Sequence, residues 1–435
     1  MATMKTIDVF DGNSLHPYPV PYPVKNPVCA FQGIGPNGEM LYVPLDENLL
    51  SRHMLILGGI GTGKTNTFIQ VLRQLIQMPQ QPRRLTPNDV VIVFDTKGDF
   101  YNEFYRPGDI VISNDHTATG PNGPDYWNIF NEVERGERME ETIIEIAKTL
   151  FAGRVEKTNQ PFFPNAAKDL FTAIMTHLAG EGNNEALRAF MDKSPTSEIR
   201  EMLKSHPQFA SMVSYISDDR SPQTQGVMSE LQQLVREIFI GNFKKNGTLS
   251  IRDAVRQKGG RMIFIEYDIG VGKALTPVYS LLFDLAIKEA LSRRRSEGNV
   301  YFIVDEFSLL PNLQHIDDAV NFGRSLGVKF MIGLQNIDQM YDNYEEYRAR
   351  NILSGFLNTV CFRVNDVTSR QFIKDLHGTN RKKEVYMASV QGRGIVENVR
   401  EANVVEDWDV SRLVLGQAII GLPGAEPFLF KFTKS

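Results

Sequence analysis

The sequence predicts an α/β protein with a mainly parallel sheet, interrupted by an all-helical segment. From residue 53 onward, short runs of branched apolar residues alternate with patterns of helical period. Between residues 135 and 245 only helical periods occur. The apolar runs are continuous rather than alternating, which is typical of strands buried on both faces. A chain of 435 residues is long enough for about two to three domains of this kind.

The expected strands share a run of apolar residues that ends at polar or glycine residues. They are residues 53–57, 90–94, 110–112, 262–265, 300–304 and 329–332. Helices are indicated by apolar residues spaced three or four apart, as in a stripe from Ala166 to Leu178 and another from Val227 to Ile238. We therefore expect an all-α inserted domain over residues 135–245.

Composition excludes several classes of protein. With 42% hydrophobic and 23% charged residues, the chain is neither disordered nor fibrous. Its cysteines, Cys29 and Cys361, are too few for a disulfide framework or a thiolate metal site, which favours the reducing cytoplasm. The seven histidines show no metal-ligand spacing, which argues against a nuclease or another metalloenzyme. The net charge of −5 provides no overall positive field, so any DNA binding must be local. No apolar run approaches the roughly 18 residues that span a bilayer.

The N-terminal 45 residues are expected to form a proline-rich arm. Prolines alternate with other residues over 16–27, and each one fixes φ and removes a backbone donor. Polyproline II or edge-strand geometry follows. Such an arm either docks a partner or lies across its own domain or a neighbouring subunit.

A phosphate-binding loop is indicated at residues 58–65, which read Gly-Gly-Ile-Gly-Thr-Gly-Lys-Thr and follow a predicted strand. Glycines let backbone amides curve around a phosphate, and the next helix adds its positive dipole end. In this pattern the lysine reaches the β- and γ-phosphates and the threonine hydroxyl reaches Mg²⁺. The candidate ATP-binding residues are Gly58, Gly59, Ile60, Gly61, Thr62, Gly63, Lys64 and Thr65.

A second acidic element follows the apolar run at residues 300–304. Asp305 is positioned to hold Mg²⁺ together with Thr65, and Glu306 to orient and deprotonate an attacking water. This is the pattern of a Walker B element. The second carboxylate favours hydrolysis over phosphoryl transfer to a small acceptor.

Further polar residues near strand ends are candidates for the same chemistry. Gln335 follows the run at 329–332 and is expected either to sense the γ-phosphate or to cap a turn. Arg324 is a candidate arginine finger supplied to a neighbouring subunit, with Arg348 and Arg350 as rivals. Asp95 ends the run at 90–94, and either faces a ligand or caps the next helix.

The segment 374–400 combines basic residues with glycines. It forms either a flexible basic loop that grips DNA phosphates or a solvated hairpin. The sequence leaves both open.

Together, these motifs resemble the TraD/TrwB-like type IV coupling proteins, which belong to the HerA/FtsK group of RecA-like motor ATPases. The likeness covers about residues 45–430. It rests on the loop 58–65, Val93 to Asp99, Trp127 to Asn131, Ser250 to Arg252, Asp305 and Glu306, Gly323 and Arg324, and Gly333 to Gln335.

The resemblance implies a RecA-like P-loop NTPase core, over residues 46–134 and 246–435, that assembles into a homohexamer and pumps DNA in conjugation. ATP and Mg²⁺ are the implied cofactors, and DNA and a relaxase or other relaxosome protein the implied partners. By position, Lys64, Thr65, Asp305 and Glu306 match the nucleotide and metal residues, Arg324 the arginine finger and Gln335 the glutamine motif. The inserted domain would receive the relaxase and its DNA.

One departure from the family concerns the membrane. Coupling proteins usually begin with transmembrane helices, whereas this sequence begins with the proline-rich arm. We therefore expect a cytoplasmic protein, peripheral at the inner face of the membrane if a separate anchor of the secretion channel holds it. A protein-secretion ATPase and a nucleotide-gated substrate receptor of the same fold are the alternative functions.

Overall fold

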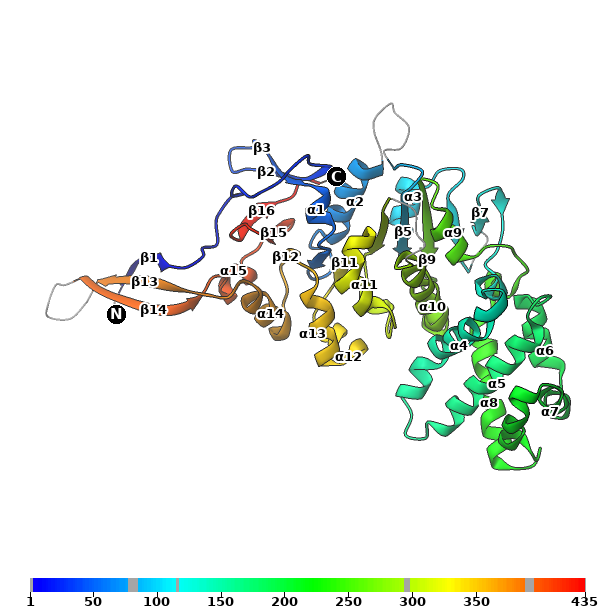
Figure 1. Cartoon of the computed structure of the whole chain (residues 1–435). Helices are drawn as coiled ribbons and strands as arrows, with labels where there is room; N and C mark the ends of the chain where they lie inside the picture. Colours follow the sequence, from blue (N-terminus) through cyan, green and yellow to red (C-terminus); the bar gives the residue numbers. More distant parts are fainter. Residues whose placement is uncertain (1–2, 77–84, 115–116, 293–297, 388–394, 435) are drawn as a thin grey trace. The chain divides into compact units, whose positions relative to one another are not determined.

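The computed structural model describes residues 3–76, 85–114, 117–292, 298–387 and 395–434 (Figure 1). The chain divides into two compact units. The first consists of Met1–Arg84, Ile303–Ser308 and Lys329–Ser435, and the second of Leu85–Phe302 and Leu309–Val328. Each unit is described by itself below.

The first unit is built on a mixed sheet whose central strands are parallel. Its strands are β4 (Met54–Leu57), β10 (Val300–Val304), β11 (Val328–Leu334), β12 (Asn358–Phe362), β15 (Gln417–Gly421) and β16 (Phe428–Lys431). The order is β16-β15-β12-β4-β11-β10, and β10 begins in the second unit and ends in the first. β4 is parallel to both β11 and β12, whereas β15 and β16 add antiparallel strands. Every residue of β4 and β11 is buried, as their continuous apolar runs predict.

The first unit contains six α-helices within its described residues. They are α1 (Glu47–Leu50), α2 (Lys64–Ile76), α12 (Asp338–Tyr344), α13 (Glu346–Ser354), α14 (Val367–His377) and α15 (Asp407–Ser411). α2 begins directly after the glycine-rich loop that ends β4. This strand, loop and helix form the local unit that the phosphate-binding pattern predicts.

The N-terminal segment is tied to its own chain by strand pairing. β1 (Thr3–Asp11) pairs antiparallel with β13 (Thr379–Met387), which also pairs with β14 (Ile395–Asn403), and the three run side by side in Figure 1. β2 (Cys29–Ile34) and β3 (Met40–Leu45) form a separate two-stranded sheet. Of the two alternatives for the arm, the structure therefore shows the one that lies on its own unit.

The basic segment 374–400 is a hairpin rather than a flexible loop. Its residues form the end of α14 and the β13–β14 ladder, while residues 388–394, including Arg393, lie outside the described residues. Three of its described cations are paired: Lys382 with Glu406 at 3.2 Å, Lys383 with Glu397 at 2.7 Å, and Arg400 with Glu384 at 2.7 Å. These three side chains are therefore engaged within the chain.

The second unit combines a small sheet with a group of helices. Its strands are β5 (Val90–Asp95), β6 (Ile110–Ile112), β7 (Thr119–Gly120), β8 (Gly123–Pro124) and β9 (Arg261–Glu266), in the order β10-β5-β9-β6-β7-β8. β9 lies parallel between β5 and β6. Together with β4, β11 and β12, these pairings confirm the predicted α/β class with a mainly parallel sheet.

The helices of the second unit fall into two groups. Those that flank its strands are α3 (Asp99–Phe104), α9 (Ile251–Gln257), α10 (Gly272–Ala290) and α11 (Ile316–Phe322). The others follow one another as α4 (Met139–Glu156), α5 (Phe162–Leu178), α6 (Asn184–Lys193), α7 (Thr196–Ser205) and α8 (Pro222–Ile238), and Figure 1 shows α5 beside α8. Residues 139–238, all of them described, contain no strand, in agreement with the helical periods of this segment.

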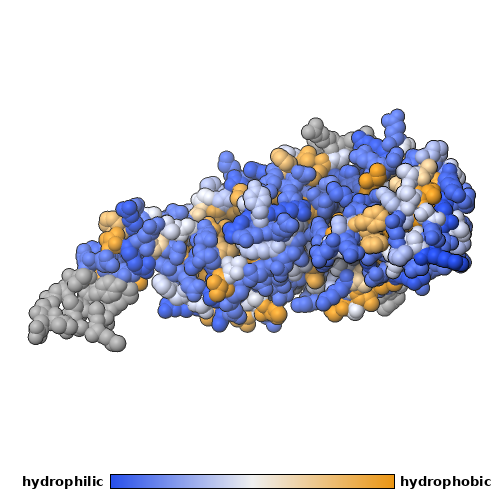
Figure 2. All heavy atoms as spheres, turned by 90° about the horizontal axis from the view of Figure 1, so that it is seen from below, coloured by the Kyte–Doolittle hydropathy of each residue, from blue (hydrophilic) through white to orange (hydrophobic). Residues whose placement is uncertain are grey.

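The face shown in Figure 2 is largely hydrophilic, with hydrophobic residues in separate patches. None of the helices in the described ranges has both the length and the apolar character needed to cross a bilayer.

His377 makes the first unit sensitive to acid. Its Nε2 is buried and makes no hydrogen bond to a described residue, and burial lowers its pKa to about 4 from 6.5. Between pH 4 and 6.5 the unfolded chain therefore binds more protons at this position than the folded chain, so stability falls as the pH drops through this window. We expect a contribution of about 1–3 kcal/mol to the free energy of unfolding, lost between pH 6.5 and 4.

Denaturant unfolding across this pH range measures the effect. The variant His377→Leu should flatten the pH dependence, because it removes the titrating group. An unchanged slope in His377→Leu would show that another group titrates.

Candidate functional site

The loop between β4 and α2 depends on glycine at particular positions. Gly61 and Gly63 have φ of +72° and +121°, which side-chain-bearing residues rarely adopt. Gly58 is required for space, because a Cβ there would lie 2.6 Å from the Cβ of Phe362. The exposed tip of the loop is Ile60.

The first two glycines anchor the loop to the sheet. The N–H of Gly58 donates to the carbonyl of Leu334 at 3.0 Å, and the N–H of Gly59 to the carbonyl of Arg363 at 3.0 Å. These amides are thus used to attach the loop to the chain at the ends of β11 and β12. The amides of the first turn of α2 have no acceptor within the helix, so the helix start supplies donors for an anion.

Lys64 folds back across its own loop. Its Nζ donates to the carbonyl oxygens of Gly58 at 2.6 Å and Gly59 at 3.2 Å, and the side chain is almost fully buried. The ammonium group is therefore held at the loop, where a phosphate oxygen would compete for the same hydrogen bonds.

Thr65 and Asp305 meet, although they are far apart in the sequence. The Thr65 hydroxyl donates to Oδ2 of Asp305 at 2.9 Å, and Asp305 is 7% exposed. Because the hydroxyl proton points to the carboxylate, the lone pairs of the Thr65 oxygen remain available to a cation. Hydroxyl and carboxylate oxygens are the ligands that Mg²⁺ prefers. The residues present therefore fit a magnesium site.

Glu306 is held from both sides. Its Oε2 accepts from Nε2 of Gln335 at 2.5 Å, and its Oε1 from the hydroxyl of Ser308 at 2.6 Å. The carbonyl of Ser308 in turn accepts from Nδ2 of Asn343 at 2.7 Å. Gln335 directly follows β11 and Glu306 closely follows β10, so adjacent strand ends bring the amide and the carboxylate together.

The close approach of β11 to the acidic element depends on Gly333. A Cβ at this position would lie 2.1 Å from the carbonyl oxygen of Asp305, which is far inside van der Waals contact. Glycine therefore sets the distance between the backbone of β11 and the residue that contacts Thr65.

Asp95 and Arg350, two further candidates from the sequence, are engaged by residues near them in the chain. Asp95 is buried in the second unit, and its carboxylate accepts the backbone N–H groups of Lys97, Gly98 and Tyr101 at 2.8–3.2 Å. It caps the start of α3, which is the second of its two alternatives. Arg350 pairs with Glu346 at 2.7 Å, so this rival for the finger role is bound within its own helix.

Arg324 lies in a short 3₁₀ helix, Gly323–Leu326, of the second unit and is exposed. Arg348 packs over the ring of Tyr344 at 5.3 Å in the first unit. Thr65 and Asp305 are thus in contact in the first unit, as are Glu306 and Gln335, whereas Arg324 belongs to the second unit.

Sequence reasoning missed three residues that shape the site. Ser308 holds Glu306, Phe362 packs against Gly58 and Gly63, and the N–H of Gly416 donates to the carbonyl of Thr62 at 3.2 Å. Ser308 was detectable as a hydroxyl two residues after the acidic pair. Phe362 and Gly416 carry no local signal, because their role depends on sheet order.

Solved structures with the same fold include those of the coupling protein TrwB. The unbound monoclinic form of TrwBdeltaN70 superimposes with a TM-score of 0.72 at 18% identity, covering 96% of this chain and 95% of that chain. TrwB in complex with ADP and Mg²⁺ gives 0.71 at 18% identity, with 96% of both chains covered. VirB4 of Thermoanaerobacter pseudethanolicus gives 0.59 at 13% identity, covering 95% of this chain and 98% of that chain. This similarity confirms the predicted fold with its RecA-like core.

Among curated proteins, the coupling protein TraD of Escherichia coli (strain K12) is 23% identical over 392 residues, covering 88% of this chain and 51% of TraD. The coupling protein VirD4 of Bartonella quintana (strain Toulouse) is 20% identical over 301 residues, covering 62% of this chain and 47% of VirD4. The chain thus spans about half the length of the curated relatives it matches.

A family match covers most of the sequence. Residues 39–433 match the family described as the type IV secretion-system coupling protein DNA-binding domain. This range includes the loop at 58–65, the acidic pair and Gln335. The chain therefore belongs to the type IV secretion-system coupling protein family.

Proposed function

We propose that this protein is an ATP-hydrolysing DNA translocase that couples relaxase-bound DNA to a type IV secretion or conjugation channel. The observation that carries the proposal is the pair of contacts Thr65–Asp305 and Gln335–Glu306 at the loop end of one sheet. A metal-binding pair beside a held glutamate is what nucleotide hydrolysis by water requires. The TrwB structures in complex with ADP and Mg²⁺ and with a non-hydrolysable ATP analogue support the cofactors.

The loop and the start of α2 bind the phosphates. Lys64 exchanges its contacts with the carbonyls of Gly58 and Gly59 for phosphate oxygens, and the first amides of α2 donate to the same anion. Thr65 holds Mg²⁺, while Asp305 fixes the orientation of the Thr65 hydroxyl and adds its negative charge. Bound Mg²⁺ supplies charge neutralisation between the phosphates.

Glu306 is the proposed general base. It accepts a proton from the attacking water, and its own orientation is set by Gln335 and Ser308. Gln335 senses the γ-phosphate, because its amide can donate either to Glu306 or to a phosphate oxygen. Arg324, exposed in the second unit, is proposed to serve a neighbouring subunit as an arginine finger.

The assembly and the partners follow from the family. We infer a homohexameric ring with DNA in its channel and a relaxase or other relaxosome protein delivered to the helices of residues 135–245. The family description as a DNA-binding domain and the match to the coupling protein TraD support this inference.

ATP hydrolysis measured with and without single- and double-stranded DNA tests the proposal. DNA should raise the turnover of the wild type but not of Lys64→Ala, and electron microscopy should show rings enclosing DNA. Turnover that is indifferent to DNA in assembled rings would contradict a DNA translocase. Capture of a relaxase independently of DNA would then favour the protein-secretion or receptor alternatives.

Ser308 gives a more local test. In Ser308→Ala one oxygen of Glu306 loses its donor, and a typical hydrogen bond contributes about 0.5–1.5 kcal/mol. We therefore expect turnover to fall about 2- to 10-fold with ATP affinity unchanged. Ser308→Thr should retain most of the rate. Ser354→Ala, which removes an exposed hydroxyl of the same unit, should leave turnover unchanged. Equal turnover in Ser308→Ala and the wild type would exclude this role of Ser308.

A further inference from the structure

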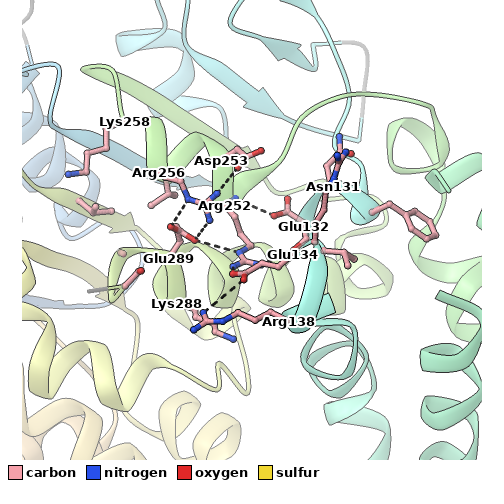
Figure 3. A pocket seen from close by; sticks show the side chains of 17 residues that line it. Asn131, Glu132, Glu134, Arg138, Arg252, Asp253, Arg256, Lys258, Lys288 and Glu289 are labelled. Carbon is pink, nitrogen blue, oxygen red and sulfur yellow. Dashed lines mark hydrogen bonds and ion pairs between the residues drawn. The ribbon is translucent and has the colours of Figure 1, made fainter. Parts of the chain in front are cut away.

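The second unit contains a large cavity that the proposed ATP chemistry does not use. Its volume is about 1100 Å³, slightly above the range of roughly 300–1,000 Å³ that is typical of ligand pockets. The walls come from the segment 130–138, from α9, from the C-terminal end of α10 and from the start of β10 (Figure 3). All of these residues belong to the second unit.

The lining of the cavity carries a positive excess in an acidic protein. The chain as a whole has a net charge of −5. The cations of the lining outnumber its carboxylates even when all of the carboxylates are ionised. The cations are Arg135, Arg138, Arg252, Arg256, Lys258 and Lys288, and the acids are Glu132, Glu134, Asp253 and Glu289.

One wall of the cavity contains the guanidinium group of Arg252, which neighbouring residues hold in place. Arg252 is 6% exposed, and its side chain donates to the carbonyl of Glu132 at 2.9 Å and to the carboxylate of Glu134. Its Nε makes no hydrogen bond to a described residue and lies 3.6 Å from an oxygen of Glu289. Figure 3 shows this side chain among the acidic residues at the centre of the lining. The Arg252 guanidinium is therefore held in a fixed position by Glu132, Glu134 and Glu289.

Most of the carboxylates are already engaged. Glu289 accepts hydrogen bonds from two nitrogens of the Arg256 guanidinium, both at 3.0 Å. Glu132 accepts hydrogen bonds from the side chains of Trp127 and Ser250 and from a backbone N–H of α9. Lys288 is paired with Glu145 on α4. These pairs fix the walls and neutralise much of the charge.

Two further cations of the lining, Arg135 and Arg138, lie at the surface of the protein. Arg135 and Arg138 are both exposed, and the guanidinium of Arg138 is 4.0 Å from Glu134, whose other oxygen is bonded to Arg252. Two arginines from one short segment thus face the cavity with weak or shared partners.

We propose that this cavity binds phosphate groups, with Arg135 and Arg138 as the principal contacts and Arg252 as the fixed floor. Arginine forks match the oxygens of phosphates and carboxylates alike. A phosphate fits better here, because its higher charge and additional acceptor oxygens can compete with carboxylates already present in the walls. The phosphate comes either from a free nucleotide or pyrophosphate or from the backbone of a DNA strand.

The test uses the full chain with Lys64→Ala, so that binding at the P-loop is weakened. Calorimetry measures the affinity for inorganic pyrophosphate. Fluorescence anisotropy measures the affinity for a thymidine oligonucleotide without terminal phosphates. The double variant Arg135→Glu, Arg138→Glu is compared with Arg220→Glu, an exposed arginine of the same unit outside the cavity. We expect the double variant to bind about tenfold more weakly or worse, and the control to stay within about twofold.

The two probes distinguish the two possible sources of the bound phosphate group. A loss for pyrophosphate alone supports a free phosphate ligand, a loss for the oligonucleotide alone supports DNA, and a loss for both supports a site that accepts either. Equal affinities of the double variant and the control, or the absence of binding of both probes before the change, overturns the proposal. If thermal unfolding shows that the double variant does not fold, Arg138→Gln against Arg220→Gln provides the same comparison.

Discussion

Replacing Glu306 with glutamine is expected to lower ATP turnover about 100- to 10,000-fold while ATP binding is retained, the usual contribution of a general base. The isosteric amide keeps the size of the side chain but cannot accept the proton of the attacking water. It also changes the contacts with Gln335 and Ser308, because both of these residues donate to the carboxylate in the native site. Binding of a fluorescent ATP analogue and steady-state hydrolysis measure the two effects separately.

Two variants provide the reference for this result. Lys64→Ala removes the ammonium held at the loop and should lose affinity for ATP as well as turnover. Glu401→Gln changes an exposed glutamate of β14 and should match the wild type in both assays. Turnover of Glu306→Gln within about tenfold of the wild type would show that Glu306 is not the base.

The sequence predicts those parts of the site in which the functional residues and the strand or helix that positions them are neighbours in the chain. The loop at 58–65 lies between a strand and a helix that are its immediate neighbours, so its pattern already contains its structural context. Asp305 and Glu306 are recognisable because a buried strand ends at them. The contact of Asp305 with Thr65 follows from strand order in a parallel sheet, which the residues alone do not specify.

The features that sequence reasoning could not decide are those set by the path of the backbone, either nearby or in a distant part of the chain. Asp95 ends a strand as Asp305 does, but its carboxylate is used by three backbone N–H groups of the next turn. Only the local path of the chain distinguishes a helix cap from a ligand residue. Similarly, β1 pairs with β13 from the other end of the chain, so the basic segment is held as a ladder rather than a loop.

The strand β11 connects the phosphate loop to the acidic element. The phosphate loop is fixed to β11 and β12 by the amides of Gly58 and Gly59. Gln335, which directly follows the same β11, donates to Glu306, so the strand that anchors the loop also carries the residue that contacts the proposed base. A displacement of β11 would therefore alter phosphate binding and the base together.

Substitution of Gly333 by alanine is expected to test this coupling through β11. The added Cβ would lie 2.1 Å from the carbonyl oxygen of Asp305, so either β11 or the acidic element must move. Overpacking of this kind typically costs about 1–3 kcal/mol of unfolding free energy. Because Asp305 contacts Thr65 and Glu306 contacts Gln335, the same movement should weaken Mg²⁺-dependent ATP binding and lower turnover at least about tenfold.

Gly153→Ala supplies the matched control. Gly153 lies within α4, an added Cβ there meets nothing within 4 Å, and alanine favours the helix by about 0.5–1 kcal/mol. Denaturant unfolding and titration of ATP against Mg²⁺ concentration should therefore show a loss for Gly333→Ala and none for Gly153→Ala. A contrary outcome is a Gly333→Ala variant that loses stability but keeps the Mg²⁺ dependence and turnover of the wild type. The close approach of β11 to Asp305 would then serve packing alone. The proposed base and the loop would not be coupled through this strand.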